Sequence, residues 1–161
     1  MRTITTFLTF PGNAEEALDF YGSVFENAKV RDRREYPPGS PFPEGTFMTA
    51  TVELEGTMLS VLNAPGAEET FTFAPGISLF VGCDTQEEVD ELWEKLSEGG
   101  QEQPCGWVTD RFGVSWQVVP RRLGELLASD SSGRVMQAML KMKKIEIAEL
   151  ERAAEGAPAA A

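Results

Sequence analysis

Two segments of the chain carry the same pattern of apolar and polar positions, one within residues 14–24 and the other within residues 86–97. In each segment the apolar side chains recur every three or four residues, which places them on one face of an amphipathic helix. The apolar positions of the two segments are Ala17, Phe20, Tyr21 and Val24 in the first, and Val89, Leu92, Trp93 and Leu96 in the second. Residues 14–21 therefore overlie residues 86–93, which makes an internal repeat with an offset of 72 positions.

The residues in front of the two helices match as well. Asn13 precedes the first helix and Glu16 follows three positions later, while Thr85 and Glu88 stand in the same relation at the second helix. A side-chain oxygen at the N-cap followed by a glutamate three residues on is typical of a capping box. We therefore predict the same type of helix start in both halves of the repeat.

Each predicted helix lies between segments that are typical of β-strands. These segments are rich in Thr, Ile, Val and Phe, which favour strands. The predicted strands are residues 3–10, 29–36, 47–54 and 57–62 in the first half, and residues 77–83, 101–103, 106–109 and 114–119 in the second. Each half is thus a βαβββ module, and a module of about 60 residues buries too little surface to be stable alone. We predict an α+β domain over residues 1–120, built from paired modules at about 1–65 and 76–120. Their curved, cup-like mixed sheet would leave a cleft for a small molecule.

The pattern changes to helical spacing after Pro120. We predict a helical C-terminal segment over residues 121–154, with helices at 121–127, 132–143 and 147–154, and a disordered tail over residues 155–161. Val135, Met139 and Met142 form an apolar stripe within it. The stripe is consistent with packing on the body or on a neighbouring subunit, and also with a partner-binding surface.

Composition and charge narrow the class of protein. The formal net charge is −12. Residues 1–120 contribute −13 to this charge, and residues 121–161 contribute +1. An acidic chain is a poor nucleic-acid binder, no segment is apolar enough to span a membrane, and residues 1–10 do not have the pattern of a signal peptide. The two cysteines, Cys83 and Cys105, are too few for a disulfide scaffold, so we expect a cytoplasmic protein. The chain has no histidine, which excludes histidine-based catalysis and histidine-ligated metal sites.

Several short motifs give the chain a resemblance to a known family. They are AEEA at 14–17 with FY at 20–21, TQEEVD at 85–90 with LW at 92–93, CGW at 105–107, Asp110, FG at 112–113, SWQVVP at 115–120 and MKKI at 142–145. With them, residues 2–152 resemble the PhnB-like branch of the vicinal oxygen chelate superfamily, which also contains glyoxalases, bleomycin-resistance proteins and extradiol dioxygenases. Members of this branch are often named demethylubiquinone methyltransferase-like, and the resemblance implies a homodimer.

The resemblance also implies where a metal would bind. Enzymes of this superfamily hold a divalent metal with His, Glu or Gln side chains on four matching strands, and those positions fall near Thr6, Ser60, Ser78 and Gln117 in this chain. Hydroxyls and a single amide are a poor ligand set for zinc, nickel or iron, and magnesium or calcium would need more carboxylates. We therefore predict a cleft that contains these four residues but no metal and no cofactor.

Three further residues are candidates for the cleft. Trp107 follows a cysteine and a glycine and could form an aromatic wall for a flat or cationic ligand, whereas Trp116 alternates with Gln117 and should pack against a helix. Glu53 and Asp110 are possible acid–base groups, although Glu53 could equally be an outward strand residue and Asp110 a turn-capping carboxylate.

Other side chains with possible chemistry are more widely spread. Tyr36 and Cys105 are further acid–base candidates near the cleft. The basic cluster of Arg31, Arg33 and Arg34 is consistent with a solvated strand edge or with an anion site.

Two functions of different classes follow from the sequence. The first is a small-molecule binder without catalysis, whose acidic body would attract a cationic ligand. The second is an enzyme that acts on a small organic substrate with carboxylate or atypical metal chemistry. A methyltransferase is less favoured, because residues 10–13 contain one glycine and not the glycine-rich turn that often binds S-adenosylmethionine.

Overall fold

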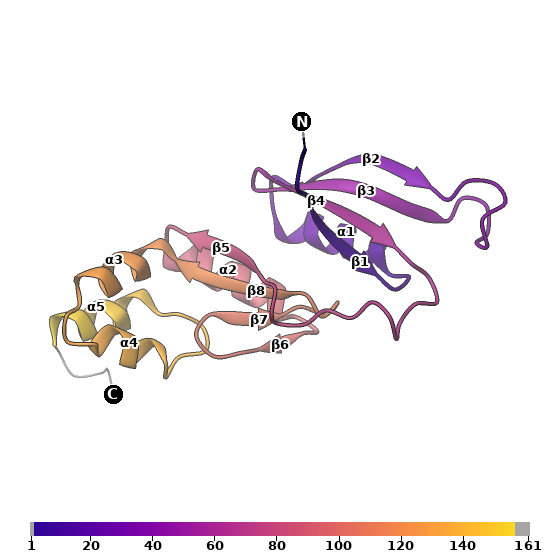
Figure 1. The fold of residues 1–161 in the computed structure, drawn as a ribbon. Coiled ribbons are helices and arrows are strands. Elements are labelled where there is room, and N and C mark those ends of the chain that lie inside the picture. The colour runs from indigo at the N-terminus through magenta and orange to yellow at the C-terminus, as the bar shows by residue number, and fades with distance from the viewer. Residues whose placement is uncertain (1, 157–161) are drawn as a thin grey trace. The chain divides into compact units, whose positions relative to one another are not determined.

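The chain forms two compact units, and each contains one half of the repeat. In the computed structural model, which describes residues 2–156, the first unit ends at Thr72 and the second begins at Phe73. The order of elements in each is strand, helix and three strands (Figure 1). The predicted α+β class and the tandem βαβββ modules are confirmed, and each module forms a four-stranded mixed sheet of its own.

The first unit consists of one sheet and one helix. Its elements are β1 (Thr6–Phe10), α1 (Ala14–Val24), β2 (Lys29–Glu35), β3 (Phe47–Leu54) and β4 (Thr57–Asn63). The strand order is β1-β4-β3-β2, with β1 parallel to β4 and the other pairs antiparallel. The helix packs its apolar stripe against β3 and β4, so one face of the sheet is covered and the other is open.

The second unit repeats this arrangement and adds three helices. Its elements are β5 (Leu79–Cys83), α2 (Gln86–Ser97), β6 (Gln101–Glu102), β7 (Trp107–Thr109), β8 (Ser115–Pro120), α3 (Arg121–Ser129), α4 (Arg134–Met139) and α5 (Ile147–Glu155). The strand order is β5-β8-β7-β6, and β5 runs parallel to β8. The helix α2 covers one face of this sheet, with Val89, Trp93 and Leu96 buried.

The two helix starts differ, although the sequence predicts the same box for both. At α2 the backbone N–H of Glu88 donates to Thr85 Oγ1 at 3.2 Å, so this cap is confirmed. At α1 the Asn13 side chain caps nothing, and the predicted box is wrong. The first helical N–H, that of Ala14, donates instead to Oδ1 of the buried Asn63 at 3.3 Å. A side chain from β4 therefore replaces the local cap, which sequence spacing does not reveal.

The C-terminal helices share a small apolar core with the end of β8. Its buried members are Leu123, Leu126, Val135, Ile145 and Leu150. The predicted helix over residues 132–143 is shorter in the structure and ends at Met139. Beyond it, the carbonyl groups of Met142 and Lys143 accept hydrogen bonds from the backbone N–H groups of Cys105 and Gly106, which replace further helical bonds.

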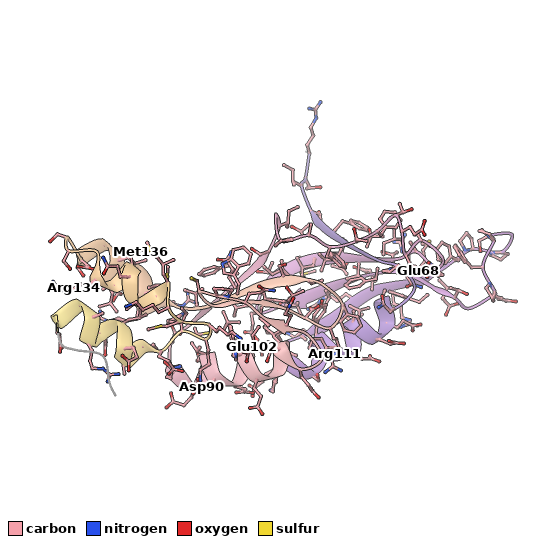
Figure 2. All side chains as sticks on the ribbon, turned by 90° about the horizontal axis from the view of Figure 1, so that it is seen from below. Glu68, Asp90, Glu102, Arg111, Arg134 and Met136 are labelled. Carbon is pink, nitrogen blue, oxygen red and sulfur yellow. The ribbon has the colours of Figure 1, made fainter. Side chains whose placement is uncertain are left out.

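The surface of the C-terminal helices is partly apolar and basic. Met136 on α4 is exposed, and Arg134 beside it donates to the carbonyl oxygens of Ala153 and Ala154 at the end of α5 (Figure 2).

Glu155, the first residue of the predicted disordered tail, is still helical, and residues 157–161 of that tail lie outside the described residues. Within residues 2–156 no helix is long and apolar enough to cross a membrane.

Candidate functional site

The open face of the second sheet carries a row of three side chains. Phe80 on β5 lies directly beside Gln117 on β8, and Gln117 lies directly opposite Trp107 on β7. Neighbours in register on adjacent strands point to the same face of a sheet. Phe80, Gln117 and Trp107 therefore form one row, which we call the aromatic row, and the strand spacing puts about 10 Å between its two aromatic ends.

The opposite face of the same strands is packed under α2. Trp116 and Val118 alternate with Gln117 along β8 and are fully buried. The prediction that Trp116 packs against a helix, on the face opposite to Gln117, is thus confirmed by the structure. Phe80, in contrast, is 62% exposed on the open face.

Ser78 and Gln117, two of the predicted site residues, are brought together by the fold. Gln117 Nε2 donates to Ser78 Oγ at 2.8 Å, which fixes the orientation of the amide. No donor within residues 2–156 reaches Gln117 Oε1. The aromatic row therefore presents one free carbonyl acceptor at its centre.

Trp107 differs from the other two tryptophans in its polar contacts. The indole N–H groups of Trp93 and Trp116 donate to Glu102 Oε1 at 3.1 Å and to Asp110 Oδ2 at 2.8 Å. No acceptor within the described residues lies in reach of the Trp107 Nε1. The row thus offers a hydrogen-bond donor and an acceptor between two aromatic surfaces, which suits a flat ligand with polar atoms at its edge.

The open face of the first sheet is related but more polar. The row equivalent to the aromatic row contains Phe7 on β1, Ser60 on β4, Thr51 on β3 and Arg31 on β2. Phe7 is 55% exposed and occupies the place that Phe80 has in the second sheet. Ser60 therefore lies on the open face, as predicted.

Thr6 lies on the other face, so its predicted place beside Ser60 is wrong. Thr6 is in register with the buried Leu59, as Leu79 is with Trp116 in the second unit. The first strands of the two modules are thus related by 73 positions, whereas the helices are related by 72. This one-residue difference exchanges the two faces of a strand, and it removes Thr6 from the candidate site.

Glu53 is on the open face of the first sheet, where it forms an ion pair. Its carboxylate lies 3.0 Å from the guanidinium of Arg31. The predicted basic cluster is divided, because Asp32 has a φ of 51° and the β2–β3 register shifts there. Arg33 therefore turns to the helix side, where it pairs with Glu15 and lies 4.8 Å from the centre of the Phe47 ring.

Asp110 is a structural residue of the β7–β8 turn and does not reach the open face. Its Oδ1 accepts hydrogen bonds from the backbone N–H groups of Phe112 at 2.9 Å and Val114 at 3.0 Å, and its Oδ2 binds Trp116. The carboxylate is 3% exposed and is fully used by these donors. The turn-capping alternative describes Asp110, and the candidate acid–base role is removed.

The remaining candidates for chemistry are also engaged elsewhere. The Tyr36 hydroxyl donates to the carbonyl oxygen of Asn63 at 2.6 Å. Burial raises the pKa of the Cys83 thiol to about 11, with the nearby Glu88 carboxylate adding to the shift. The Cys105 Sγ faces the carbonyl oxygen of Met139 at 3.7 Å. None of these three groups lies in the aromatic row.

The open faces do not fit a divalent metal. The side chains beside Ser60 and Gln117 on the first strands are Phe7 and Phe80, which have no donor atom. Within the described part of the chain, no group of three or more Cys, Asp and Glu side chains is placed to hold a metal ion. The donor set therefore argues against the metal that the superfamily resemblance implies.

Phe7 and Phe80 lie on the open faces, although the sequence pattern does not single them out as site residues. Both were included in predicted strands, but only the strand register shows that they lie on the open face. The signal that could have found them is the recurrence of Phe at corresponding strand positions, where alternation with the helix-facing Leu8 and Val81 leaves the phenyl group outside.

Comparison with known proteins gives one family match and several similar structures. A family model described as 3-demethylubiquinone-9 3-methyltransferase matches residues 2–119. A PhnB protein from Bacillus cereus is similar with a TM-score of 0.66 and 36% sequence identity, over 74% of this chain and 99% of the Bacillus chain. No curated protein matches the chain.

Two more distant structures share the fold alone. Protein PA1353 from Pseudomonas aeruginosa matches with a TM-score of 0.59 and 23% identity, over 72% of this chain and 95% of its own. The fosfomycin resistance protein FosX from Listeria monocytogenes, solved with Mn(II), matches with a TM-score of 0.53 and 13% identity, over 72% of this chain and 90% of its own.

Proposed function

The chain belongs to the 3-demethylubiquinone-9 3-methyltransferase family, in the PhnB-like branch of the vicinal oxygen chelate superfamily, and on this premise we propose that it binds a flat small molecule without a metal. The binding surface is the open face of the second sheet. The observation that carries the proposal is the aromatic row, in which the Trp107 N–H and Gln117 Oε1 are unused between two aromatic side chains.

The charge of the chain supports a cationic ligand. Residues 1–120 carry a net charge of −13, so the potential around the sheets attracts cations. An aromatic face also attracts a cation, which adds about 0.5–2 kcal/mol when the contact is shielded from water. The ligand class that fits both properties is a flat, positively charged ring system with a polar edge.

The proposal is tested by calorimetric titration with N-methylquinolinium and with the matched flat anion 2-naphthalenesulfonate. We expect the cation to bind more tightly than the anion. Replacing Trp107→Ala or Phe80→Ala should weaken cation binding by about tenfold, since each removes one aromatic contact of about 1–1.5 kcal/mol.

A matched control for these variants is Val30→Ala. Val30 is an exposed apolar residue on β2, in register with Val52 and so on the face opposite to Thr51 and Arg31. It is no part of the aromatic row, and its replacement should leave the affinity unchanged. Binding that is equally tight in Trp107→Ala and in the wild type would overturn the proposed site. Binding of the anion alone would overturn the proposed ligand charge.

The absence of a metal requirement has its own test. We expect protein purified without chelator to contain no stoichiometric transition metal, and added Mn²⁺, Ni²⁺ or Zn²⁺ to leave the melting temperature unchanged. A stoichiometric metal, or a metal-dependent rise in melting temperature, would contradict this part of the proposal.

Methyl transfer is a second candidate, favoured by the description of the matching family. The turn from β1 to α1 contains one glycine, Gly12, and offers no glycine-rich loop for S-adenosylmethionine. Calorimetric titration with S-adenosylmethionine distinguishes the two candidates. Saturable binding would favour the transferase, whereas no heat of binding is the result that we expect.

The proposed setting is a homodimer in the cytoplasm that does not bind nucleic acid. Exposed apolar side chains on the open faces, among them Phe7, Met58 and Phe80, support association with a second copy. Both cysteines are free thiols, which suits a reducing compartment. Light scattering coupled to size-exclusion chromatography should give the mass of a dimer, and a monomer mass at all concentrations would contradict it.

A further inference from the structure

The C-terminal helices are an addition to the part of the chain that the comparisons match. The family model ends at residue 119. The match to the PhnB protein from Bacillus cereus covers 99% of the Bacillus chain but only 74% of this one. The helices α3, α4 and α5 follow directly after β8 and lie at the end of its sheet (Figure 1). These helices therefore lie beyond the part of the chain that the family model covers.

The added segment is firmly attached to the module. The backbone N–H groups of Cys105 and Gly106 donate to the carbonyl oxygens of Met142 at 2.9 Å and Lys143 at 2.7 Å. A side chain at Gly106 would lie 2.8 Å from the carbonyl oxygen of Val118 and 3.1 Å from Ile145, so the approach requires glycine there.

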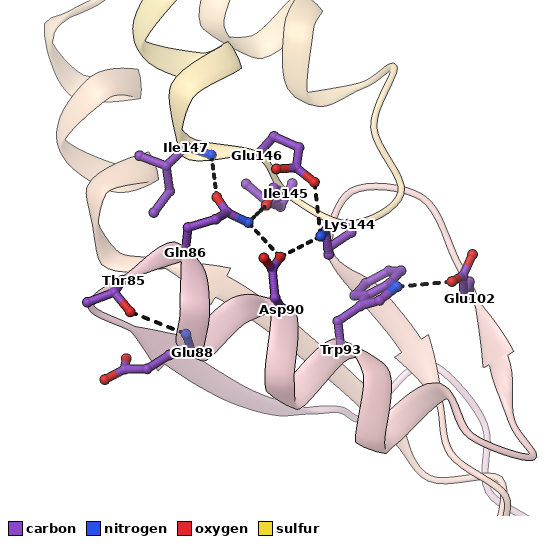
Figure 3. Close-up of polar contacts among 10 residues, drawn as sticks. All are labelled: Thr85, Gln86, Glu88, Asp90, Trp93, Glu102, Lys144, Ile145, Glu146 and Ile147. Carbon is purple, nitrogen blue, oxygen red and sulfur yellow. Dashed lines mark hydrogen bonds and ion pairs between the residues drawn. The ribbon is translucent and has the colours of Figure 1, made fainter.

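A second attachment involves the start of α2. Gln86 Nε2 donates to the carbonyl oxygen of Ile145 at 3.0 Å, and Gln86 Oε1 accepts from the backbone N–H of Ile147 at 2.8 Å (Figure 3). Lys144 also forms an ion pair with Asp90, which itself accepts a hydrogen bond from Gln86. The segment is thus held by backbone, amide and charged contacts, as a fixed element of the second unit.

This fixed segment closes the open face just beyond the aromatic row. Gly82 and Val119 are in register and follow Phe80 and Gln117 by two positions, so they lie on the same face. Val119 packs against the apolar core of the C-terminal helices. The Arg121 side chain covers Gly82, since its atoms lie 3.4 Å from where a Cβ of residue 82 would be. Arg121 also forms an ion pair of 2.9 Å with Asp84 at the surface.

We propose that the C-terminal segment is the specificity-determining end wall of this ligand face, with Arg121 as the residue that limits ligand length. This inference rests on the proposed function. The next row begins about 7 Å along the strands from the aromatic row, at a rise of about 3.3 Å per residue. A ligand that lies on the aromatic row with its long axis along β5 and β8 therefore meets Arg121 before it reaches Gly82. In this orientation the wall favours two fused rings over three.

The test compares N-methylquinolinium, with two fused rings, and N-methylacridinium, with three. We expect the wild type to prefer the shorter cation. The Arg121→Ala variant removes the side chain over Gly82 and should raise the affinity for the acridinium, relative to the quinolinium, by about tenfold. The ratio of the two affinities is the measured quantity.

Two further variants separate the effect of the length of the Arg121 side chain from the effect of its charge and from general effects on α3. Arg121→Gln removes the charge but keeps most of the length, so both cations should bind more tightly while their ratio stays near that of the wild type. Arg122→Ala is the matched control, because Arg122 pairs with Glu125 and Glu151 and not with the residues around Gly82. The ratio of the two affinities in Arg122→Ala should equal that of the wild type.

The outcomes distinguish failure of the wall from failure of the site. In one outcome, both cations bind in a way that depends on Trp107, and the ratio of their affinities is the same in Arg121→Ala and in the wild type. This result would contradict the role of Arg121 as an end wall but would leave the proposed function intact. Binding of neither cation, or binding that does not depend on Trp107, would overturn both.

Discussion

At the scale of single residues, the partners of the polar atoms separate structural groups from candidate ligand-binding groups. The carboxylate of Asp110 and the indole N–H groups of Trp93 and Trp116 are all used inside the second unit. Trp107 Nε1 and Gln117 Oε1 have no such use within residues 2–156. Trp107 Nε1 and Gln117 Oε1 are therefore the polar atoms on this face that can bind a ligand.

The structural role of Asp110 predicts a large loss of stability on substitution. The Asp110→Ala variant removes the carboxylate that accepts from two turn N–H groups and from the buried Trp116 indole. We expect a loss of about 2–4 kcal/mol in the free energy of unfolding, measured by urea denaturation. Glu94→Ala, on the exposed side of α2, should cost less than about 0.5 kcal/mol. A loss of that small size in Asp110→Ala would contradict the assigned role.

The raised pKa of Cys83 predicts an unreactive thiol. Burial raises the pKa from its ordinary value near 9.0 to about 11. In a Cys105→Ser background at pH 8, we expect Ellman's reagent to label Cys83 at least about a hundredfold more slowly in the native than in the unfolded protein, because the thiolate fraction falls by that factor. Equal labelling rates would contradict the burial.

The same shift has a consequence for stability against pH. A group whose pKa is raised by folding stabilises the native state below the pKa of the unfolded chain, and this contribution is lost as the pH rises through the folded value. For Cys83 the loss falls between pH 9.0 and about 11. Urea denaturation across this range should show a steeper decline in wild type than in Cys83→Ala, and parallel declines would contradict the linkage.

At the scale of elements, local and tertiary contacts compete for the helix ends. Thr85 caps α2 with its own hydroxyl, whereas α1 receives its cap from Asn63 on β4. The helix predicted over residues 132–143 similarly ends early, because the backbone N–H groups of Cys105 and Gly106 bind the carbonyl groups of Met142 and Lys143. Sequence patterns predicted each element correctly but not the ends that distant residues determine.

The difference between the two helix starts predicts unequal effects of matched substitutions. Thr85→Ala removes a cap and should lower the free energy of unfolding by about 1 kcal/mol. Asn13→Ala removes a side chain that makes no cap bond, and it should cost less than about 0.5 kcal/mol. Urea denaturation of both variants checks this order. An equal loss in both would indicate that Asn13 caps α1 in solution.

Strand register is the second property that the repeat did not determine. The offset of 72 between the helices was visible, but the first strands are related by 73 positions. Because side chains alternate, one residue was enough to place Thr6 on the wrong face and to hide Phe7 and Phe80. Ser60, Trp107 and Gln117 lie on the open faces, and Ser78, which directly precedes β5, contacts Gln117 there.

At the scale of the whole molecule, the missing histidines and the internal repeat lead to one account. The repeat defines two sheets with one open face each, and the strand positions beside Ser60 and Gln117 carry phenyl groups. These positions therefore offer aromatic surface and no metal-ligating atom. The α+β class, the family and the modules could be predicted from the sequence, since they depend on periodicity and motifs.

The central claim, that the aromatic row binds a flat cation, is tested most directly by nuclear magnetic resonance of the ¹⁵N-labelled protein during titration with N-methylquinolinium. The account predicts that the side-chain amide of Gln117 and the indole N–H of Trp107 shift progressively and saturate together. The indole signals of Trp93 and Trp116, which are bound inside the unit, should stay in place. Saturating shifts elsewhere, with the Gln117 and Trp107 signals unmoved, would contradict the account.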